Sequence, residues 1–199
     1  QPMGMKYFTF GQTGAERARD VSTGVPMKLV DLFLTYAVGG SIDEVVEVTN
    51  DDRFQDIIVP AGNLYATAEE ASRFFQMLLN GGHYNGQQIF KPETVARALQ
   101  PAYHRPRFDR SLFIPLNFSS GFMLGNRGMG MFGPGAPRAF GHLGFISIYC
   151  WADPQRALSG ALLTTGKGVV GPHLPSLFGL QHTINRHTRL REGSSPVTA

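Results

Sequence analysis

The chain has 199 residues, a length typical of one domain rather than two, and its 42% hydrophobic residues allow a real core, which excludes a disordered chain. The net charge is +3 and the basic residues are scattered, apart from Arg186, Arg189 and Arg191, so no nucleic-acid surface is predicted. One cysteine excludes an internal disulfide, and no apolar run approaches the roughly 18 residues of a membrane span.

The sequence therefore predicts a soluble protein, and it does not indicate whether that protein is cytoplasmic, periplasmic or secreted. Its first sixty residues carry few local signals. Residues 2–10 have no helix cap and resemble the end of an element, and the chain begins with Gln1, so we expect its natural start to lie elsewhere. Residues 11–24 are polar, as in a loop, and residues 27–48 mix apolar and acidic side chains without a clear period.

The clearest element is a helix within residues 66–82. Thr67 precedes Glu70 by three positions, so each side chain can bind the other's free backbone N–H in a capping box. Apolar side chains then recur at helical spacing up to Leu79, and Gly81 and Gly82 supply a left-handed stop. A tight turn is predicted at residues 84–87, followed by a short helix from residue 92 to about residue 99.

A block of antiparallel strands is predicted within residues 119–165. Its three apolar runs, at 121–124, 139–151 and 158–165, are separated by glycine, proline and Asp-Pro turns rather than by helical segments. The three prolines of residues 101–118 instead indicate an irregular surface segment before the sheet. A helix at 173–188 and a polar tail at 189–199 complete the chain. Helices on either side of an antiparallel block indicate the α+β class.

Motifs that could bind a cofactor or a metal have simpler interpretations. Residues 128–133 match Gly-x-Gly-x-x-Gly, but prolines follow at once where a dinucleotide site needs a helix. His182 and His187 are five residues apart, which does not place both on one helix face as zinc ligands. Cys150 lies in an apolar run and is interpreted as a core thiol. No cofactor and no metal are predicted.

His142 is the best candidate functional residue because of its setting. It lies between Gly141 and Gly144 in a predicted strand, and glycine weakens strands, so a ligand or another backbone is expected to approach there. Such a strand could offer a backbone N–H to a developing oxyanion. A structural bend is the alternative interpretation, and the residues alone leave both open.

Several segments, taken in order, resemble the serine β-lactamase-like hydrolases, a family that includes class C β-lactamases, D-alanyl-D-alanine carboxypeptidases and family VIII carboxylesterases. Residues 2–11 are similar to the family's "PLGM…T.FG" stretch, and residues 60–82 to its "P.GGL.STA.D..RF..MLLNGG" signature. Residues 140–145 resemble the third active-site motif, which is Lys-Thr-Gly in β-lactamases and often His-x-Gly in the esterase-like branch. Asp153 and Pro154 resemble the turn between the last two strands.

The resemblance implies a β-lactamase/transpeptidase-like fold with an antiparallel sheet flanked by helices and an active site along the third-motif strand. His142 would occupy the place of the motif's basic residue and assist substrate binding and proton transfer. Leu143 and Gly144 would contact the substrate, with Gly144 permitting its close approach. The backbone N–H of Phe145 would form half of an oxyanion hole.

The family's other two motifs are absent from this sequence. No serine has a lysine three residues on, and no tyrosine has asparagine or serine two residues on. In family order both motifs precede the "PLGM" stretch, so we expect residues 1–199 to be the C-terminal part of a single domain, incomplete at the N-terminus. Covalent acyl transfer needs an activated nucleophile, and the chain alone is therefore expected to be inactive.

Hydrolysis of a carboxylic ester through an acyl-serine is the leading functional prediction, because histidine at the third motif is commoner in the esterase-like branch. Hydrolysis of a β-lactam or a D-Ala-D-Ala peptide is the alternative, and a non-catalytic binding or assembly module on the same scaffold is a further one. The predicted partners are a small ester or lactam and the missing N-terminal part of the domain.

Overall fold

The structure is a computed structural model that describes residues 2–12, 32, 35–36, 39–60, 62–109, 114–128, 130–144, 148–164, 174–188 and 190. Its centre is a six-stranded antiparallel sheet in which each strand lies beside its neighbour in the sequence, in the order β10-β9-β8-β7-β6-β5. The strands are β5 (Arg107–Asp109), β6 (Ile114–Phe118), β7 (Met123–Leu124), β8 (Phe140–Leu143), β9 (Tyr149–Asp153) and β10 (Leu158–Leu162). The predicted antiparallel block is confirmed.

Two of these strands, β5 and β6, lie in the segment predicted to be irregular, and that prediction is wrong. Pro115 is paired with Phe108 inside the β5–β6 ladder. On β6, only Asn117 and Phe118 pair with β7, so among the described strands Pro115 has a neighbour on one side alone. A proline without an N–H is tolerated at such a position, because no second ladder needs its donor.

Helix α4 (Ala68–Leu79) begins and ends as predicted. The Thr67 hydroxyl accepts from the Glu70 backbone N–H, the Glu70 carboxylate accepts from the Thr67 N–H, and both halves of the capping box are present. Gly81 and Gly82 follow with φ of 64° and 93°. A Cβ at Gly82 would lie 2.0 Å from the Phe90 carbonyl oxygen, so both the backbone angle and the space require glycine there.

The remaining elements surround this unit. The predicted turn at 84–87 joins β3 (His83–Tyr84) to β4 (Gln87–Gln88), and the predicted short helix is α5 (Pro92–Ala98). β1 (Thr9–Phe10) pairs with β2 (Leu64–Tyr65), and α6 (Leu174–His187) is the predicted C-terminal helix.

Two helices, α2 (Ile42–Asn50) and α3 (Asp52–Asp56), lie where no element was predicted. Helix α2 starts at a capping box between Ser41 and Glu44, a local signal that the irregular apolar pattern obscured.

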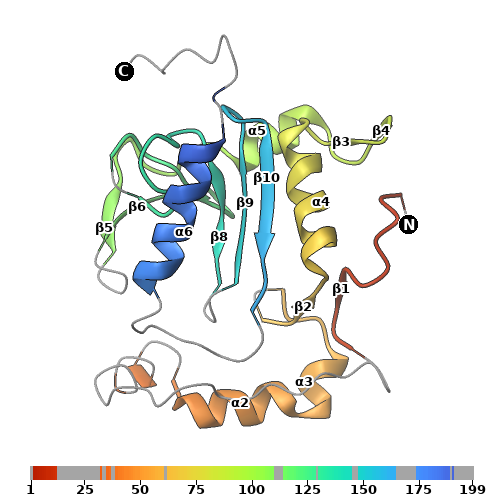
Figure 1. Ribbon diagram of the computed structural model, residues 1–199. Coiled ribbons are helices and arrows are strands. Elements are labelled where there is room, and N and C mark those ends of the chain that lie inside the picture. Colours follow the sequence, from red (N-terminus) through yellow and green to blue (C-terminus); the bar gives the residue numbers. More distant parts are fainter. Residues whose placement is uncertain are drawn as a thin grey trace.

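Helices cover both faces of the sheet, with α4 on one side of β8–β10 and α6 on the other (Figure 1). On the α4 side, Phe75 and Leu78 pack with Phe140 and Ala152. On the α6 side, Trp151 belongs to a second cluster, against which apolar side chains of α6 pack. Burying apolar area on both faces is what makes a sheet of such short strands stable. Among the described residues, no helix has the length and apolarity needed to cross a bilayer.

Candidate active site

Strand β8 carries two of the four residues predicted to form the site, His142 and Leu143, and it lies in close contact with β9. Gly141 is paired with Trp151, and a Cβ at Gly141 would lie 2.1 Å from the Cys150 carbonyl oxygen and 2.6 Å from the Trp151 Cα. Another backbone is therefore what requires glycine at this position. The glycine signal in the sequence is explained here by sheet packing and not by a ligand.

His142 lies on the α4 face of β8 but remains exposed. It shares that face with Phe140, which is 2% exposed, since residues two apart in a strand point to the same side. The imidazole Nδ1 lies 2.7 Å from the Leu143 carbonyl oxygen. Because a carbonyl oxygen can only accept, this hydrogen bond requires the proton on Nδ1. In the tautomer with the proton on Nδ1, Nε2 carries the lone pair and can accept a hydrogen bond or a proton.

The other predicted site residues have different surroundings. The Leu143 side chain is buried on the opposite face of the sheet, in the cluster with Trp151, so only its backbone is placed to meet a substrate. The Gly144 N–H donates to the Ile148 carbonyl oxygen at 2.6 Å, and a Cβ at Gly144 would lie 3.3 Å from the Ile148 Cβ. Gly144 and Ile148 thus lie side by side where β8 ends and before β9 begins. Phe145 lies outside the described residues.

A cysteine adjoins His142, which the sequence pattern did not indicate. Cys150 is the cross-strand partner of His142 in the β8–β9 ladder, and its side chain is half-buried. Burial raises the pKa of the Cys150 thiol to about 11, so it is protonated near neutral pH. A thiolate is the nucleophilic form of cysteine. This pair therefore does not form an activated cysteine–histidine dyad, in agreement with the prediction of a core thiol.

Serine hydroxyls on the same face are engaged in packing. The Ser159 hydroxyl on β10 donates to the Gln76 side-chain oxygen at 3.2 Å and lies 3.3 Å from the Ser72 hydroxyl, both on α4. These contacts join helix to sheet. Among the described residues, no group of three or more His, Cys, Asp or Glu side chains could hold a metal ion.

The described residues of the glycine-rich segment before β8 form turns and bends, and none of them lies in a helix such as a dinucleotide site needs. Met131 and Phe132 are buried in the core, so this loop is anchored on the α6 face of the sheet. Three side chains donate to its carbonyl oxygens, which the sequence alone did not reveal. They are Tyr149 to Met131 at 2.9 Å, Asn185 to Phe132 at 2.6 Å and Arg156 to Gly135 at 2.9 Å.

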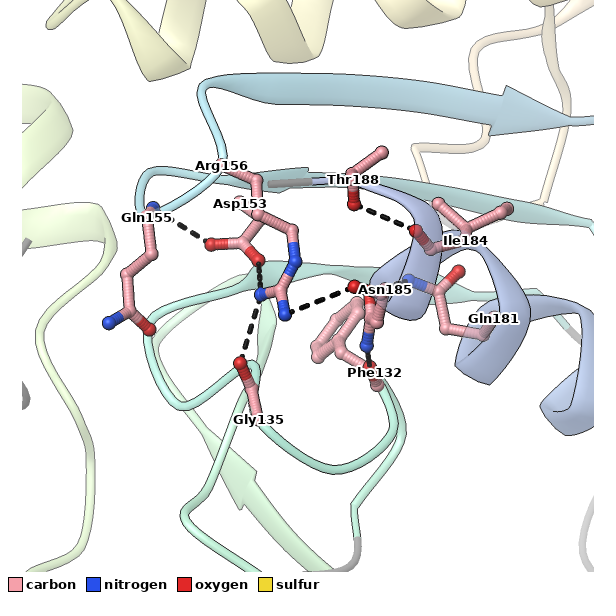
Figure 2. A network of polar contacts seen from close by, with 9 residues as sticks. All are labelled: Phe132, Gly135, Asp153, Gln155, Arg156, Gln181, Ile184, Asn185 and Thr188. Carbon is pink, nitrogen blue, oxygen red and sulfur yellow. Dashed lines mark hydrogen bonds and ion pairs between the residues drawn. The ribbon is translucent and has the colours of Figure 1, made fainter. Parts of the chain in front are cut away.

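Arg156 also forms a buried ion pair with Asp153 at the turn between β9 and β10 (Figure 2). Their side chains are 6% and 2% exposed, and the Arg156 Nη1 lies 2.6 Å from the Asp153 Oδ2. The Asp153 Oδ1 accepts from the backbone N–H of Gln155, and the Arg156 Nη2 lies 3.5 Å from the Asn185 carbonyl oxygen. The Asp-Pro turn is visible in the sequence, whereas its partners on the loop and on α6 are not.

Comparison with known proteins places this arrangement in a family. A family model described as Beta-lactamase matches residues 1–175. The chain is 32% identical over 166 residues to the esterase/beta-lactamase LipL of Mycobacterium tuberculosis, a match that covers 77% of this chain and 35% of that protein.

Solved structures agree on the fold. A penicillin-binding protein homolog from Caulobacter crescentus superimposes with a TM-score of 0.63 at 20% identity, covering 93% of this chain and 49% of that one. A family VIII carboxylesterase superimposes with a TM-score of 0.52 at 22% identity, covering 67% and 36%. The chain spans about a third of the length of the curated relative and less than half of these structures. The predicted β-lactamase/transpeptidase-like fold is confirmed, and the chain belongs to the Beta-lactamase family.

Proposed function

We propose that this chain supplies the third-motif strand of a serine hydrolase that cleaves carboxylic esters through an acyl-serine. The observation that carries the proposal is His142, which is exposed on β8 with Nδ1 bonded to the Leu143 carbonyl and with no hydrogen bond to Nε2 from the part of the chain that the structure describes. The names of relatives support an ester substrate, since one is an esterase/beta-lactamase and another a family VIII carboxylesterase.

In this proposal the nucleophilic serine and its base belong to the region of the relatives that the chain does not span. Residues 1–199 would then be the C-terminal part of one domain, and alone they would not form an acyl-enzyme. The serine oxygen bonds to the ester carbonyl carbon while its proton passes to the base, and the carbon–alkoxide bond then breaks. The departing alkoxide takes up a proton, and water later releases the acid from the serine.

His142 would act on the substrate side of this reaction. Its Nε2 can accept a hydrogen bond from a substrate group, or carry a proton toward the departing alcohol as general acid. The Phe145 backbone N–H remains our proposed oxyanion donor, and the backbone at Leu143 and Gly144 our proposed contact with the substrate. Hydrogen-bond donors aimed at a developing oxyanion are worth about 10²–10³ in kcat.

Hydrolysis of p-nitrophenyl esters by the natural protein that contains this sequence tests the proposal. We expect turnover by that protein, and a fall of about 10²–10⁴ in kcat for His142→Ala. His187→Ala is the matched control, because His187 is also exposed and also has Nδ1 against a backbone carbonyl oxygen, that of Thr183. Unchanged hydrolysis in His142→Ala would contradict the role of His142, and ester turnover by the 21.8 kDa chain alone would contradict the need for an outside nucleophile.

Comparing the turnover of two substrates distinguishes β-lactam hydrolysis from ester hydrolysis. A lysine at the third motif would be a permanent cation for a substrate carboxylate, which histidine is not near pH 7. We therefore expect faster turnover of short esters than of nitrocefin. A non-catalytic module would instead be indicated by two results together. The protein would bind either substrate without turnover, and its coding sequence upstream of Gln1 would lack Ser-x-x-Lys.

A further inference from the structure

The loop of residues 125–139 is the only covalent connection between β7 and β8, and it determines how β8 enters the sheet. Its two ends are joined by the Gly125 N–H, which donates to the Ala139 carbonyl oxygen at 2.7 Å. The base is closely packed, since a Cβ at Gly125 would lie 2.0 Å from the Ala136 carbonyl oxygen. Ala139 is three residues before His142, so the placement of the loop base bears directly on the candidate site.

The ladder alone holds β8 weakly on the β7 side. Only two residue pairs join these strands, whereas four join β8 to β9. Close-packed interiors transmit displacement because they contain little free space to absorb it. Whatever holds the loop against the sheet therefore helps to set the position of β8, and with it the direction of the His142 side chain.

Arg156 is the centre of the contacts that hold this loop. Its guanidinium joins three parts of the fold (Figure 2). It binds the Gly135 carbonyl of the loop and the Asp153 carboxylate of β9, and it lies 3.5 Å from the Asn185 carbonyl oxygen of α6. Asn185 in turn donates to the Phe132 carbonyl, and Figure 2 shows loop, hairpin and helix meeting at this point. A planar group with five donors suits such a junction better than the single ammonium of lysine.

We infer that Arg156 is a positioning residue for His142, acting through the loop that leads into β8. The inference rests on the proposed role of His142. It goes beyond that role because it concerns a residue remote from the candidate site. Arg156 lies at the opposite end of β9 from Cys150, the cross-strand partner of His142. From residue 153 to residue 150 the strand rises about 10 Å. Arg156 itself would not touch the substrate.

The test uses the natural protein with Arg156→Met and Arg156→Lys. Two further variants keep the test decisive if the arginine variants fold poorly. They are Tyr149→Phe and Asn185→Ala, and each removes one donor to the loop without removing a charge. Arg73→Met is the control, because Arg73 forms a surface ion pair with Glu69 one turn away on α4. All measurements are made well below each variant's melting temperature.

Two readouts separate positioning from simple stabilisation. We expect kcat for ester hydrolysis to fall about 10–100-fold with KM nearly unchanged in Arg156→Met, to fall less in Arg156→Lys, and to stay constant in the control. We also expect ¹⁵N spectra of histidine-labelled protein to lose the Nδ1–H tautomer of His142. A lower melting temperature with unchanged kcat and unchanged His142 signals would overturn the inference.

The spectroscopic readout distinguishes the two proposals from each other. If the natural protein hydrolyses no ester, the proposed function fails, but the His142 tautomer still reports on its placement. A changed tautomer in Arg156→Met then supports positioning, and an unchanged tautomer refutes it.

Discussion

Glu70 fastens the N-terminal segment to helix α4, and its removal should detach that segment. The carboxylate is 5% exposed and its Oε1 accepts from the backbone N–H groups of Lys6 at 2.5 Å and of Tyr7 at 2.8 Å. Its Oε2 accepts from the Thr67 N–H at 3.3 Å as part of the capping box. One side chain therefore satisfies three backbone donors from two distant parts of the chain.

The magnitude follows from these three bonds. A hydrogen bond to a charged group contributes about 1.5–3 kcal/mol, and a buried donor left without a partner costs about 1–3 kcal/mol. The Lys6 and Tyr7 backbones can reach water once the segment detaches, which limits the loss. We therefore expect Glu70→Ala to lower the free energy of unfolding by about 2–4 kcal/mol. Glu70→Gln keeps one acceptor oxygen, and its loss should be smaller, about 1–2 kcal/mol.

Urea unfolding gives the free energy, and hydrogen exchange at the Lys6 and Tyr7 amides reports the local attachment. Glu69→Gln is the matched control on the exposed side of the same helix turn. Equal losses for Glu69→Gln and Glu70→Gln would refute the reasoning, as would unchanged exchange at residues 6 and 7 in Glu70→Ala.

The same contact should depend on pH. Burial would raise the pKa of Glu70, but the backbone hydrogen bonds of Tyr7, Thr67 and Lys6 oppose it, and the net pKa lies below the usual 4.5. A carboxyl whose folded-state pKa is lowered contributes stability above its unfolded pKa and loses it as the pH falls through the folded one. We expect the protection of the amides of residues 6 and 7, relative to their intrinsic exchange rates, to fall below about pH 4.5. In Glu70→Gln this pH dependence of the protection should be absent.

Three further changes are predicted. Gly160→Ala should destabilise the sheet by about 1–3 kcal/mol or more in urea unfolding, because its Cβ would lie 2.5 Å from the Trp151 ring; a neutral effect would show that the ring can move. Iodoacetamide should label Cys150 far more slowly in the folded than in the unfolded protein at pH 8, since burial raises the pKa of its thiol to about 11; equal rates would contradict this. Asn63→Ala should lower the free energy of unfolding by about 2–4 kcal/mol, because the Asn63 amide is 2% exposed and bonds three backbone groups within residues 54–59. A decrease no larger than that of a surface substitution in the same assay would contradict this prediction.

Elements whose signals lie within a few residues were predictable from the sequence. The α4 cap at Thr67 and the stop at Gly81 are decided by backbone groups one helical turn away, so the structure repeats the predicted bounds closely. Helix α2 has the same kind of cap at Ser41, and it was missed because its apolar residues show no clear period. Strand β6 was missed for another reason, since prolines usually interrupt strands. Pro115 pairs with Phe108 of β5 and has no ladder on its other side among the described strands, so its missing N–H is tolerated.

The candidate site divides in the same way. His142 could be singled out from its neighbours in the sequence, and the resemblance of its motif agrees with the family that the comparisons show. Its exposure, its bond to the Leu143 carbonyl and the pairing with Cys150 required the sheet. The interpretation of Gly141 also changed, because the backbone that requires it belongs to β9 and not to a ligand.

By itself the sequence determined the α+β class, the helix boundaries around α4, the antiparallel order of β7–β10 and the histidine that carries the functional hypothesis. These depend on caps, turns and apolar periods, which act over a few residues. Only the tertiary structure decided that Arg156, Asn185 and Tyr149 converge on the loop before β8. Their partners lie 18 to 53 residues away along the chain, and such contacts form only when the sheet and α6 have packed together.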